Sequence, residues 1–260
     1  MKRIVIFALA LLTTVSCQFN FLKNIVSGDG IPVETPFPVT DFSSISSAGS
    51  MDIHYTQTPG AYSATLTSDS NLAEFYDVKS ENGTLSTRVQ KGVIVRPETK
   101  TFLTANSSAL EAIKVSGSGD CEINGDLVVN TDFEFCLSGS GDLEAGGVIK
   151  CNKFSSEVLG SGGIEVGSIL ADGADFSISG SGNVDVYSIS AKSITVSIAG
   201  SGNVTLVCLD AGDIDIKITG SGNVRLTGNA RSLNTKITGS GRVNSKGLVY
   251  PANTTSDGAE

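Results

Sequence analysis

The chain has 260 residues, and its 18 Lys and Arg against 27 Asp and Glu give a formal net charge of −9. Nucleic acid and anionic lipid headgroups are therefore excluded as preferred partners, because both are recognised through a basic surface. With 30 Gly, no Trp and only 17% charged residues, the composition also disfavours a helical bundle and a disordered acidic chain.

Residues 1–16 have the features of a secretory signal peptide. Lys2 and Arg3 precede an apolar run over residues 4–12, which is too short to cross a bilayer as a helix. The run leads to Val15-Ser16-Cys17, which resembles the lipobox of bacterial lipoproteins, where the cysteine is diacylated as the signal is removed. We therefore expect Cys17 to carry the lipid that holds the protein in a membrane. Signal cleavage after Ser16 without lipidation is the alternative.

Residues 17–38 contain Gly, Pro and few periodic apolar positions, so we expect a tether between the lipidated cysteine and the folded part. Gln18 is not followed by an acidic run. The sequence therefore leaves open whether the protein is a periplasmic or a cell-surface component of the envelope.

Four cysteines remain once Cys17 is assigned to the anchor, and these are Cys121, Cys136, Cys151 and Cys208. They share no common spacing, and neither a C-x-x-C pair nor a histidine cluster accompanies them. Secretion permits disulfides. The spacing nevertheless favours small free thiols, with a disulfide among the four as the alternative.

Residues 39–109 are expected to form a β-rich N-terminal lobe that closes one end of the fold. Residues 42–55 look like a degenerate strand-turn-strand unit with Gly49 and Ser50 at its centre. Asn82-Gly83 between two alternating runs predicts a β-hairpin. Residues 70–76 are expected to make a helical turn with Ser70 as its cap.

Residues 110–248 are dominated by an internal repeat. Gly-Ser-Gly begins at residues 117, 139, 160, 180, 200, 220 and 239, and apolar residues alternate on both sides of each copy. Alternation on both sides of a glycine turn predicts a strand, a corner and a second strand, and a period of about 20 residues matches one coil of a β-solenoid. An antiparallel stack of hairpins is the alternative, although its tight turns favour Asn-Gly over these corners. Residues 249–260 are expected to form a mobile tail.

The order of these features resembles the bacterial family described as putative auto-transporter adhesin, head GIN domain. The resemblance covers residues 39–247 and rests on three segments: 42–53, Asn82-Gly83-Thr84-Leu85, and the repeated Ile-x-Gly-Ser-Gly-Asn-Val unit as at 218–224. It implies an all-β protein that is exported and often lipidated, with a right-handed parallel β-helix of about seven coils and a β-rich lobe. It implies no catalytic residues.

One outward position of the repeat collects carboxylates. Five residues after the first Gly of successive copies stand Glu122, Glu144, Glu165 and Asp185, and Asp120 and Asp142 flank the first two. Stacked about 4.8 Å apart, these groups repel one another unless something screens them. A solvated acidic face is the favoured interpretation, with Ca²⁺ binding and acid-base catalysis as alternatives.

No Arg or His is expected in this cluster. His54, the only histidine, alternates with Ile53 and Tyr55 and is expected to be an inert side chain that points away from the core.

The favoured function is a non-enzymatic, membrane-anchored binding or adhesion module that contacts a cell-surface glycan or an envelope protein. The first alternative is a polysaccharide lyase or hydrolase centred on Glu122, Glu144 and Asp142. The second is a structural or lipid-binding envelope component. No cofactor is expected beyond the Ca²⁺ alternative, and the sequence leaves the ligand and the oligomeric state open.

Overall fold

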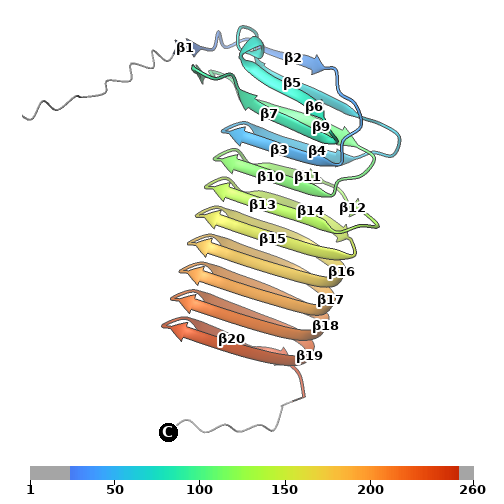
Figure 1. Cartoon of the computed structure of the whole chain (residues 1–260), viewed down its shortest axis with the longest axis vertical. Coiled ribbons are helices and arrows are strands. Elements are labelled where there is room, and N and C mark those ends of the chain that lie inside the picture. Colours follow the sequence, from blue (N-terminus) through green and yellow to red (C-terminus); the bar gives the residue numbers. More distant parts are fainter. Residues whose placement is uncertain (1–23, 252–260) are drawn as a thin grey trace, which may run out of the picture.

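The computed structural model describes residues 24–251, most of which lie in β-strands stacked along one axis (Figure 1). The predicted signal peptide, the predicted lipidation at Cys17 and residues 252–260 of the predicted tail lie outside the described residues. Within the described range, no helix has the length and apolar character that a membrane span requires.

The predicted β-solenoid is confirmed. Each coil contains one strand that ends at the first Gly of a Gly-Ser-Gly corner and another that follows the corner. Neighbouring coils pair in parallel and in register, so Gly160, Gly180 and Gly200 lie directly over one another. This parallel pairing excludes the antiparallel stack of hairpins.

We call the strands that precede the corners the first face and the strands that follow them the second face. The first face consists of the short strands β3 (Ser44–Gly49), β10 (Ala112–Gly117), β13 (Phe133–Gly139) and β15 (Lys153–Gly160), and of the second halves of four long strands. The second face consists of β4 (Asp52–Gln57), β11 (Cys121–Asn124), β14 (Leu143–Lys150) and β20 (Arg242–Val249), and of the first halves of the same long strands.

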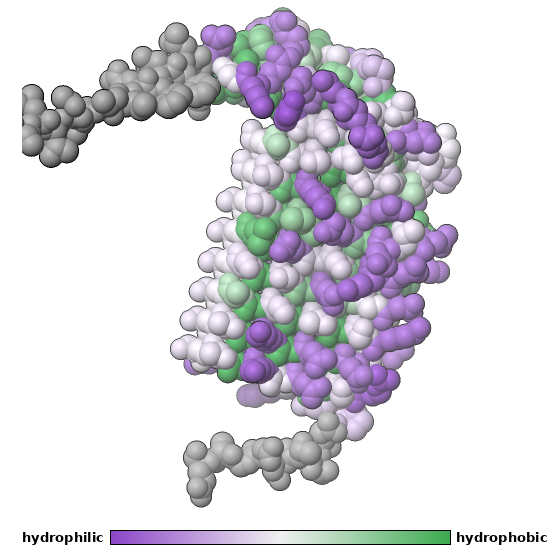
Figure 2. Space-filling model, in the orientation of Figure 1, coloured by the Kyte–Doolittle hydropathy of each residue, from purple (hydrophilic) through white to green (hydrophobic). Residues whose placement is uncertain are grey.

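The long strands are β16 (Gly163–Gly180), β17 (Asn183–Gly200), β18 (Asn203–Gly220) and β19 (Asn223–Gly239). Each runs along the second face, bends at the side of the solenoid opposite the corners, and continues along the first face of the next coil (Figure 1). We call this bend the rounded edge. The short strand β12 (Leu127–Val128) lies there beside the end of β14. Figure 2 shows a pale edge of weakly polar residues where the corners stack, and strongly hydrophilic residues over the opposite edge.

The corners require glycine because neighbouring coils approach one another closely there. Gly200 has a φ of +136°, and a Cβ at this position would overlap the carbonyl oxygen of Gly180 in the preceding coil. That same oxygen accepts a hydrogen bond of 2.8 Å from the N–H of Ser201. The second corner glycine, Gly202, would bring a Cβ to 2.6 Å from the side chain of Ile178. Both glycines of a corner are therefore fixed by the contact with the coil before.

The core consists of columns in which each coil contributes one residue. Ile178, Ile198 and Ile218 form one such column, and none is more than 2% exposed. Aromatic side chains fill the coils nearer the N-terminus, where the ring of Phe154 lies 6.0 Å from that of Phe133 and 5.6 Å from that of Phe176. Burying each such side chain contributes roughly 1.5 to 3 kcal/mol, so repetition makes the core stable.

The tether predicted for residues 17–38 is wrong over residues 24–37, which form two strands. β1 (Asn24–Ser27) pairs in parallel with β8 (Val93–Arg96), and β2 (Pro32–Phe37) pairs antiparallel with β5 (Ser63–Asp69). The alternation of exposed and half-buried residues along β2 ends at Phe37, which packs against the core. Pro32 and Pro36 lack an N–H, which suits a strand at the edge of a sheet and obscured this one in the sequence.

The unit at residues 42–55 is a complete coil of the solenoid, and its interpretation as a degenerate repeat is confirmed. Gly49 pairs in register with Gly117, and β3 and β4 lie over β10 and β11. On their other side they pair in parallel with β7 (Thr84–Val89) and β9 (Phe102–Ser107). The chain thus leaves this coil, builds the lobe through β5–β9, and returns to the opposite side of the same coil at β10 (Figure 1).

Two local predictions for the lobe have different outcomes. The hairpin at Asn82-Gly83 is confirmed, since β6 (Tyr76–Glu81) pairs antiparallel with β7 and both turn residues have positive φ. The helical turn is a 3₁₀ turn over Ala73–Phe75, but the prediction of Ser70 as its cap is wrong. The hydroxyl of Ser70 donates instead to Asp29, which ties the start of the chain to the end of β5.

Candidate functional site

The second face carries a row of ionisable side chains, with one from each of five successive coils. Strand register places them side by side in the order His54, Glu122, Glu144, Glu165 and Asp185. We call these five residues the acidic row. The four carboxylates that the sequence placed in one outward column therefore do lie in one line.

The N-terminal end of the acidic row borders a hollow of about 290 Å³. A second line of carboxylates, formed by Asp52, Asp120 and Asp142, lies on the corner side of this hollow, and Lys100 from the segment before β9 also lines it. The repeat pattern could not predict the position of Lys100, because this residue belongs to the lobe and not to a repeat. The hollow is therefore lined jointly by the lobe, through Lys100, and by the first three coils of the solenoid.

The expectation that no histidine belongs to the carboxylate cluster is wrong. The Nδ1 atom of His54 lies 3.6 Å from Oε2 of Glu122, and its ring stacks on Phe102 with centroids 4.7 Å apart. The sequence contained the signal, because His54 stands five residues after Gly49, just as Glu122 stands five residues after Gly117. Its side chain does point away from the core, as expected, and is 28% exposed.

The aspartates beside the row have a structural role. Asp52, Asp120 and Asp142 each use Oδ1 to accept a hydrogen bond from the backbone N–H at the same position in the next coil, with distances of 3.0, 2.9 and 2.6 Å. Farther along the same column, Asn203 donates to Asn183 and Asn223 donates to Asn203, at 2.9 and 3.0 Å. These three carboxylates thus join neighbouring coils together. The carboxylates of the acidic row are therefore the ones that are more available to contact a ligand.

An exposed tyrosine lies beside the C-terminal end of the acidic row, in the same coil as Asp185. The hydroxyl of Tyr187 donates a 2.7 Å hydrogen bond to Oε1 of Glu165, while 60% of the residue is exposed. This hydrogen bond and the negative charges of Glu165, Asp185 and Glu144 raise the pKa of Tyr187. The sequence analysis missed Tyr187, although it stands two residues after Asp185 and therefore on the same side of the strand.

The acidic row is solvated, since 48% of the Glu122 side chain is exposed. Over residues 24–251, no three His, Cys, Asp or Glu side chains converge in a way that could hold a metal ion. The geometry therefore gives the Ca²⁺ alternative no set of ligands, and that alternative stays a prediction.

Among the residues that the structure describes, Cys121, Cys136, Cys151 and Cys208 are all free thiols. Burial, followed by the charges of Glu122 and Asp120, raises the pKa of Cys121 to about 12. Burial and the neighbouring Glu157 also raise the pKa of Cys136, whose Sγ lies 3.8 Å from that carboxylate. A raised pKa leaves little thiolate at neutral pH, so these cysteines are poor nucleophiles.

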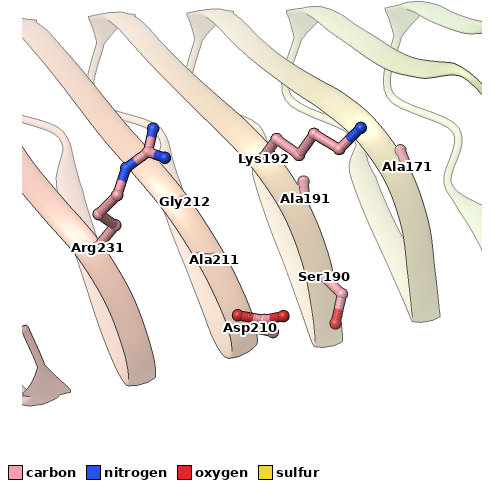
Figure 3. A pocket seen from close by; sticks show the side chains of 8 residues that line it. All are labelled: Ala171, Ser190, Ala191, Lys192, Asp210, Ala211, Gly212 and Arg231. Atoms are coloured by element: carbon pink, nitrogen blue, oxygen red, sulfur yellow. The ribbon is translucent and has the colours of Figure 1, made fainter.

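A second hollow, of about 360 Å³, lies on the rounded edge (Figure 3). Its floor is a column of small residues that includes Ala171, Ala191 and Ala211. Lys192 and Arg231 border it, and both are engaged by neighbours of opposite charge. The Nζ atom of Lys192 lies 2.7 Å from Asp172, and the guanidinium of Arg231 pairs with Asp213.

Hydrogen bonds from Arg231 and Ser232 hold the pKa of Asp213 at about 2, so this pair stays ionised at neutral pH. Because the two bordering cations already have partners, the acidic row is the stronger candidate for a contact surface.

Comparison with known proteins agrees with the fold and the repeat. A family model described as putative auto-transporter adhesin, head GIN domain, matches residues 41–208 and, in a second match, residues 174–256. No curated protein matches the sequence significantly.

Three solved structures illustrate the likeness. A putative adhesin from Bacteroides fragilis aligns with a TM-score of 0.74 and 21% identity, covering 86% of this chain and all of that one. A putative lipid binding protein from Parabacteroides distasonis aligns with a TM-score of 0.69 and 26% identity, covering 87% of this chain and all of that one. A putative adhesin from the same species gives a TM-score of 0.70 and 23% identity with the same coverage.

Proposed function

The chain belongs to the family described as putative auto-transporter adhesin, head GIN domain, and from this premise we propose that it is a non-enzymatic binding module of the cell envelope. Its contact surface is the acidic row with the hollow at its N-terminal end, and its ligand is a glycan that is neutral or carries amino groups. Lipidation at Cys17 holds this module in a membrane.

The observation that carries the proposal is an exposed line of carboxylates with aromatic side chains at its two ends. The stacked rings of His54 and Phe102 lie at one end, and Tyr187 lies on the same face toward the other end. Glu122 and Glu144 lie between them in successive coils, about 4.8 Å apart. Aromatic rings pack against the apolar faces of sugar rings, and each carboxylate accepts hydrogen bonds from neighbouring hydroxyls.

The charge of the surface selects among glycans. Four carboxylates of the acidic row face solvent, and the positive groups near them are Lys100 and, when protonated, His54. An anionic polysaccharide is repelled by such a surface, whereas an amino sugar is attracted. The same argument disfavours a lyase or hydrolase for acidic polysaccharides, since its substrate would meet like charge.

The lipid-binding alternative has less support from the geometry. One structural relative carries the name putative lipid binding protein. In this chain, however, both hollows described above are open and are bordered by charged side chains. Acyl chains are held by apolar pockets that remove them from water, and neither hollow has that character.

The proposal is tested with the full chain on an array of neutral, amine-bearing and anionic glycans. We expect binding to the first two classes, and binding of the amine-bearing class should weaken at least about tenfold in Glu144→Gln, which removes a charge without changing the shape. Tyr187→Ala should weaken both classes. Glu157→Gln on the first face is the matched control, and it should bind as the unaltered chain does.

Three results would contradict the proposal. The first is an array without binding, and the second is an equal loss of binding in Glu144→Gln and Glu157→Gln. The third is release of reducing or unsaturated ends from an acidic polysaccharide, with or without Ca²⁺, because that would establish the enzyme alternative.

A further inference from the structure

The charges of the second face change sign along the solenoid. The acidic row ends in β17, and the next residue of its column is Thr205 in β18, which is followed by Arg225 in β19. In β20, Asn244 pairs with Arg225, and the exposed side chains of Arg242 and Lys246 stand two residues to either side of it. We call Arg225, Arg242 and Lys246 the basic end of the second face.

The basic end is free to meet an acidic surface. Its three side chains are exposed, and within residues 24–251 none of them takes part in an ion pair. Asp185, the nearest carboxylate of the acidic row, lies two coils from Arg225, about 9.6 Å along the axis. The two ends of the face therefore carry opposite charges that do not pair within one chain.

Exposed apolar side chains lie between the two charged ends. Tyr187 in β17 and Leu209 in β18 are each 60% exposed, and half-buried Val207 stands two residues before Leu209. Tyrosine and aliphatic side chains are typical of the centre of a protein interface, and charged groups are typical of its rim. The second face thus has an apolar centre with an acidic side and a basic side.

We propose that the second face docks on the second face of another copy of this chain, with the two solenoids antiparallel. A two-fold axis that runs parallel to the strands, between β17 and β18, keeps each column opposite itself and reverses the order of the coils. β17 of one copy then faces β18 of the other, β16 faces β19, and β14 faces β20. At the centre, Tyr187 packs against Val207 of the second copy.

The antiparallel order matches the charges. Glu165 lies opposite Arg225 of the second copy, because β16 and β19 carry them at the same position of the column. Glu144 lies opposite Asn244, between Arg242 and Lys246. The two-fold axis repeats each of these contacts, so every ion pair forms twice. A parallel arrangement would instead place each carboxylate of the acidic row opposite its own copy, and like charges repel.

The area of the contact indicates a weak, reversible dimer. Six second-face strands, spaced about 4.8 Å apart, cover about 29 Å along the axis, and five residues of each strand cover about 17 Å. This gives about 500 Å² on each copy and about 1,000 Å² in total, close to the lower limit for a specific interface. The lobes lie at opposite ends of such a dimer, because β14 is the first second-face strand that meets the other copy.

This contact goes beyond the proposed glycan binding and does not rest on it. A glycan and a second copy would both cover Glu165 and Tyr187, so they would compete for the same face. Dimerisation is therefore measured without glycan. A monomer that still binds glycans would contradict the dimer alone, and a dimer that binds none would contradict the glycan proposal alone.

Sedimentation velocity of the full chain, at concentrations up to several hundred micromolar, tests the proposal. We expect a reversible dimer. Glu165→Arg and Arg225→Glu each place like charges opposite one another twice, and each should weaken dimerisation at least about tenfold. An equal mixture of the two variants restores both ion pairs in the mixed dimer. The mixture should therefore dimerise about as tightly as the unaltered chain.

Glu157→Arg and Lys217→Glu are the matched controls. They make the same changes of charge at exposed positions of the first face, and they should leave the dimer intact. Three results would overturn the proposal: a monomer at every concentration, a dimer that both second-face variants leave unchanged, or a mixture of these variants that stays monomeric.

Discussion

The two ends of the molecule are stabilised by different means. In the coils from β16 to β19, most inward columns repeat apolar residues of similar kind, and each coil pairs with the next in the same parallel register. The lobe has no such repetition and depends on single contacts between segments that are distant in the sequence. In the coils a substitution therefore acts through the neighbouring coil, whereas in the lobe it acts through one particular partner.

Asp69 is the clearest of the single contacts in the lobe. Its carboxylate is fully buried, with Oδ1 accepting a 2.9 Å hydrogen bond from the N–H of Gly30. Its Oδ2 accepts from the N–H groups of Glu98 and Thr99 at 3.0 and 3.3 Å. One side chain thus joins the loop between β1 and β2, the end of β5 and the segment that leads to β9.

The largest expected effect is a difference in stability between a glycine substitution at a corner inside the stack and one at the corner at its end. In Gly200→Ala the new Cβ overlaps the carbonyl oxygen of Gly180, and we expect a loss of more than about 4 kcal/mol in the free energy of unfolding. Gly49 has a similar φ of +119°, but no atom of the described part of the chain lies within 4 Å of a Cβ placed there. Gly49→Ala should therefore cost only the backbone strain, about 1 to 3 kcal/mol.

Denaturant unfolding of both variants measures this difference. Equal losses would show that backbone strain alone, and not the approach of the neighbouring coil, makes glycine necessary at the corners.

The second prediction concerns acid and the lobe. Burial raises the pKa of Asp69, but the hydrogen bonds from Thr99, Glu98 and Gly30 outweigh it and hold the pKa below its ordinary value. A lowered pKa in the folded state means that this stabilisation is complete above the unfolded pKa of about 3.9 and is lost as the pH falls through the folded value. Lowering the pH from 5 to 2 should therefore release the amides of the lobe before those of β17 and β18.

Asp69→Asn should reduce the stability of the lobe at pH 7 and weaken its dependence on pH below 4, as measured by amide exchange at several pH values. Asp213→Asn is the control in the coils. Its carboxylate also has a lowered pKa, but its ion pair with Arg231 is exposed, and exposed pairs contribute little to stability. If both substitutions destabilised the same region equally, the buried contact would have no special role in the lobe.

The same contrast explains what the sequence could predict. The solenoid was predictable because each column is sampled many times, so that Val184, Val204 and Val224 reveal one inward position. The acidic row was predictable for the same reason. The strands β1 and β2 were not, because each occurs once and the prolines of β2 resemble a linker.

The residues of the proposed contact surface also fall into two groups, those that the repeat pattern can place and those that the lobe supplies. The repeat pattern is sufficient to place His54, because it stands five residues after Gly49, as Glu122 stands five residues after Gly117. Lys100 and Phe102 could not be placed by counting, because the chain reaches them through the lobe and only the pairing of β9 with β4 brings them to the row.

The smallest expected effect tests the regularity of the core itself. Ser156 occupies an inward position in register with Phe135 and Phe176 and is 3% exposed, and its hydroxyl has no hydrogen-bond partner within residues 24–251. A buried hydroxyl without a partner lowers stability, and Ala is close to Ser in size. Ser156→Ala should therefore leave the free energy of unfolding unchanged or raise it by up to about 1 kcal/mol.

Ser155→Ala, one residue earlier and on the outward side of β15, is the matched control and should stay within about 0.5 kcal/mol. A loss above about 1 kcal/mol in Ser156→Ala alone would mean that the hydroxyl makes a hydrogen bond in solution. In that case the large rings of Phe135 and Phe176 would enclose a polar contact, and the coils would depend, like the lobe, on a single interaction at this point.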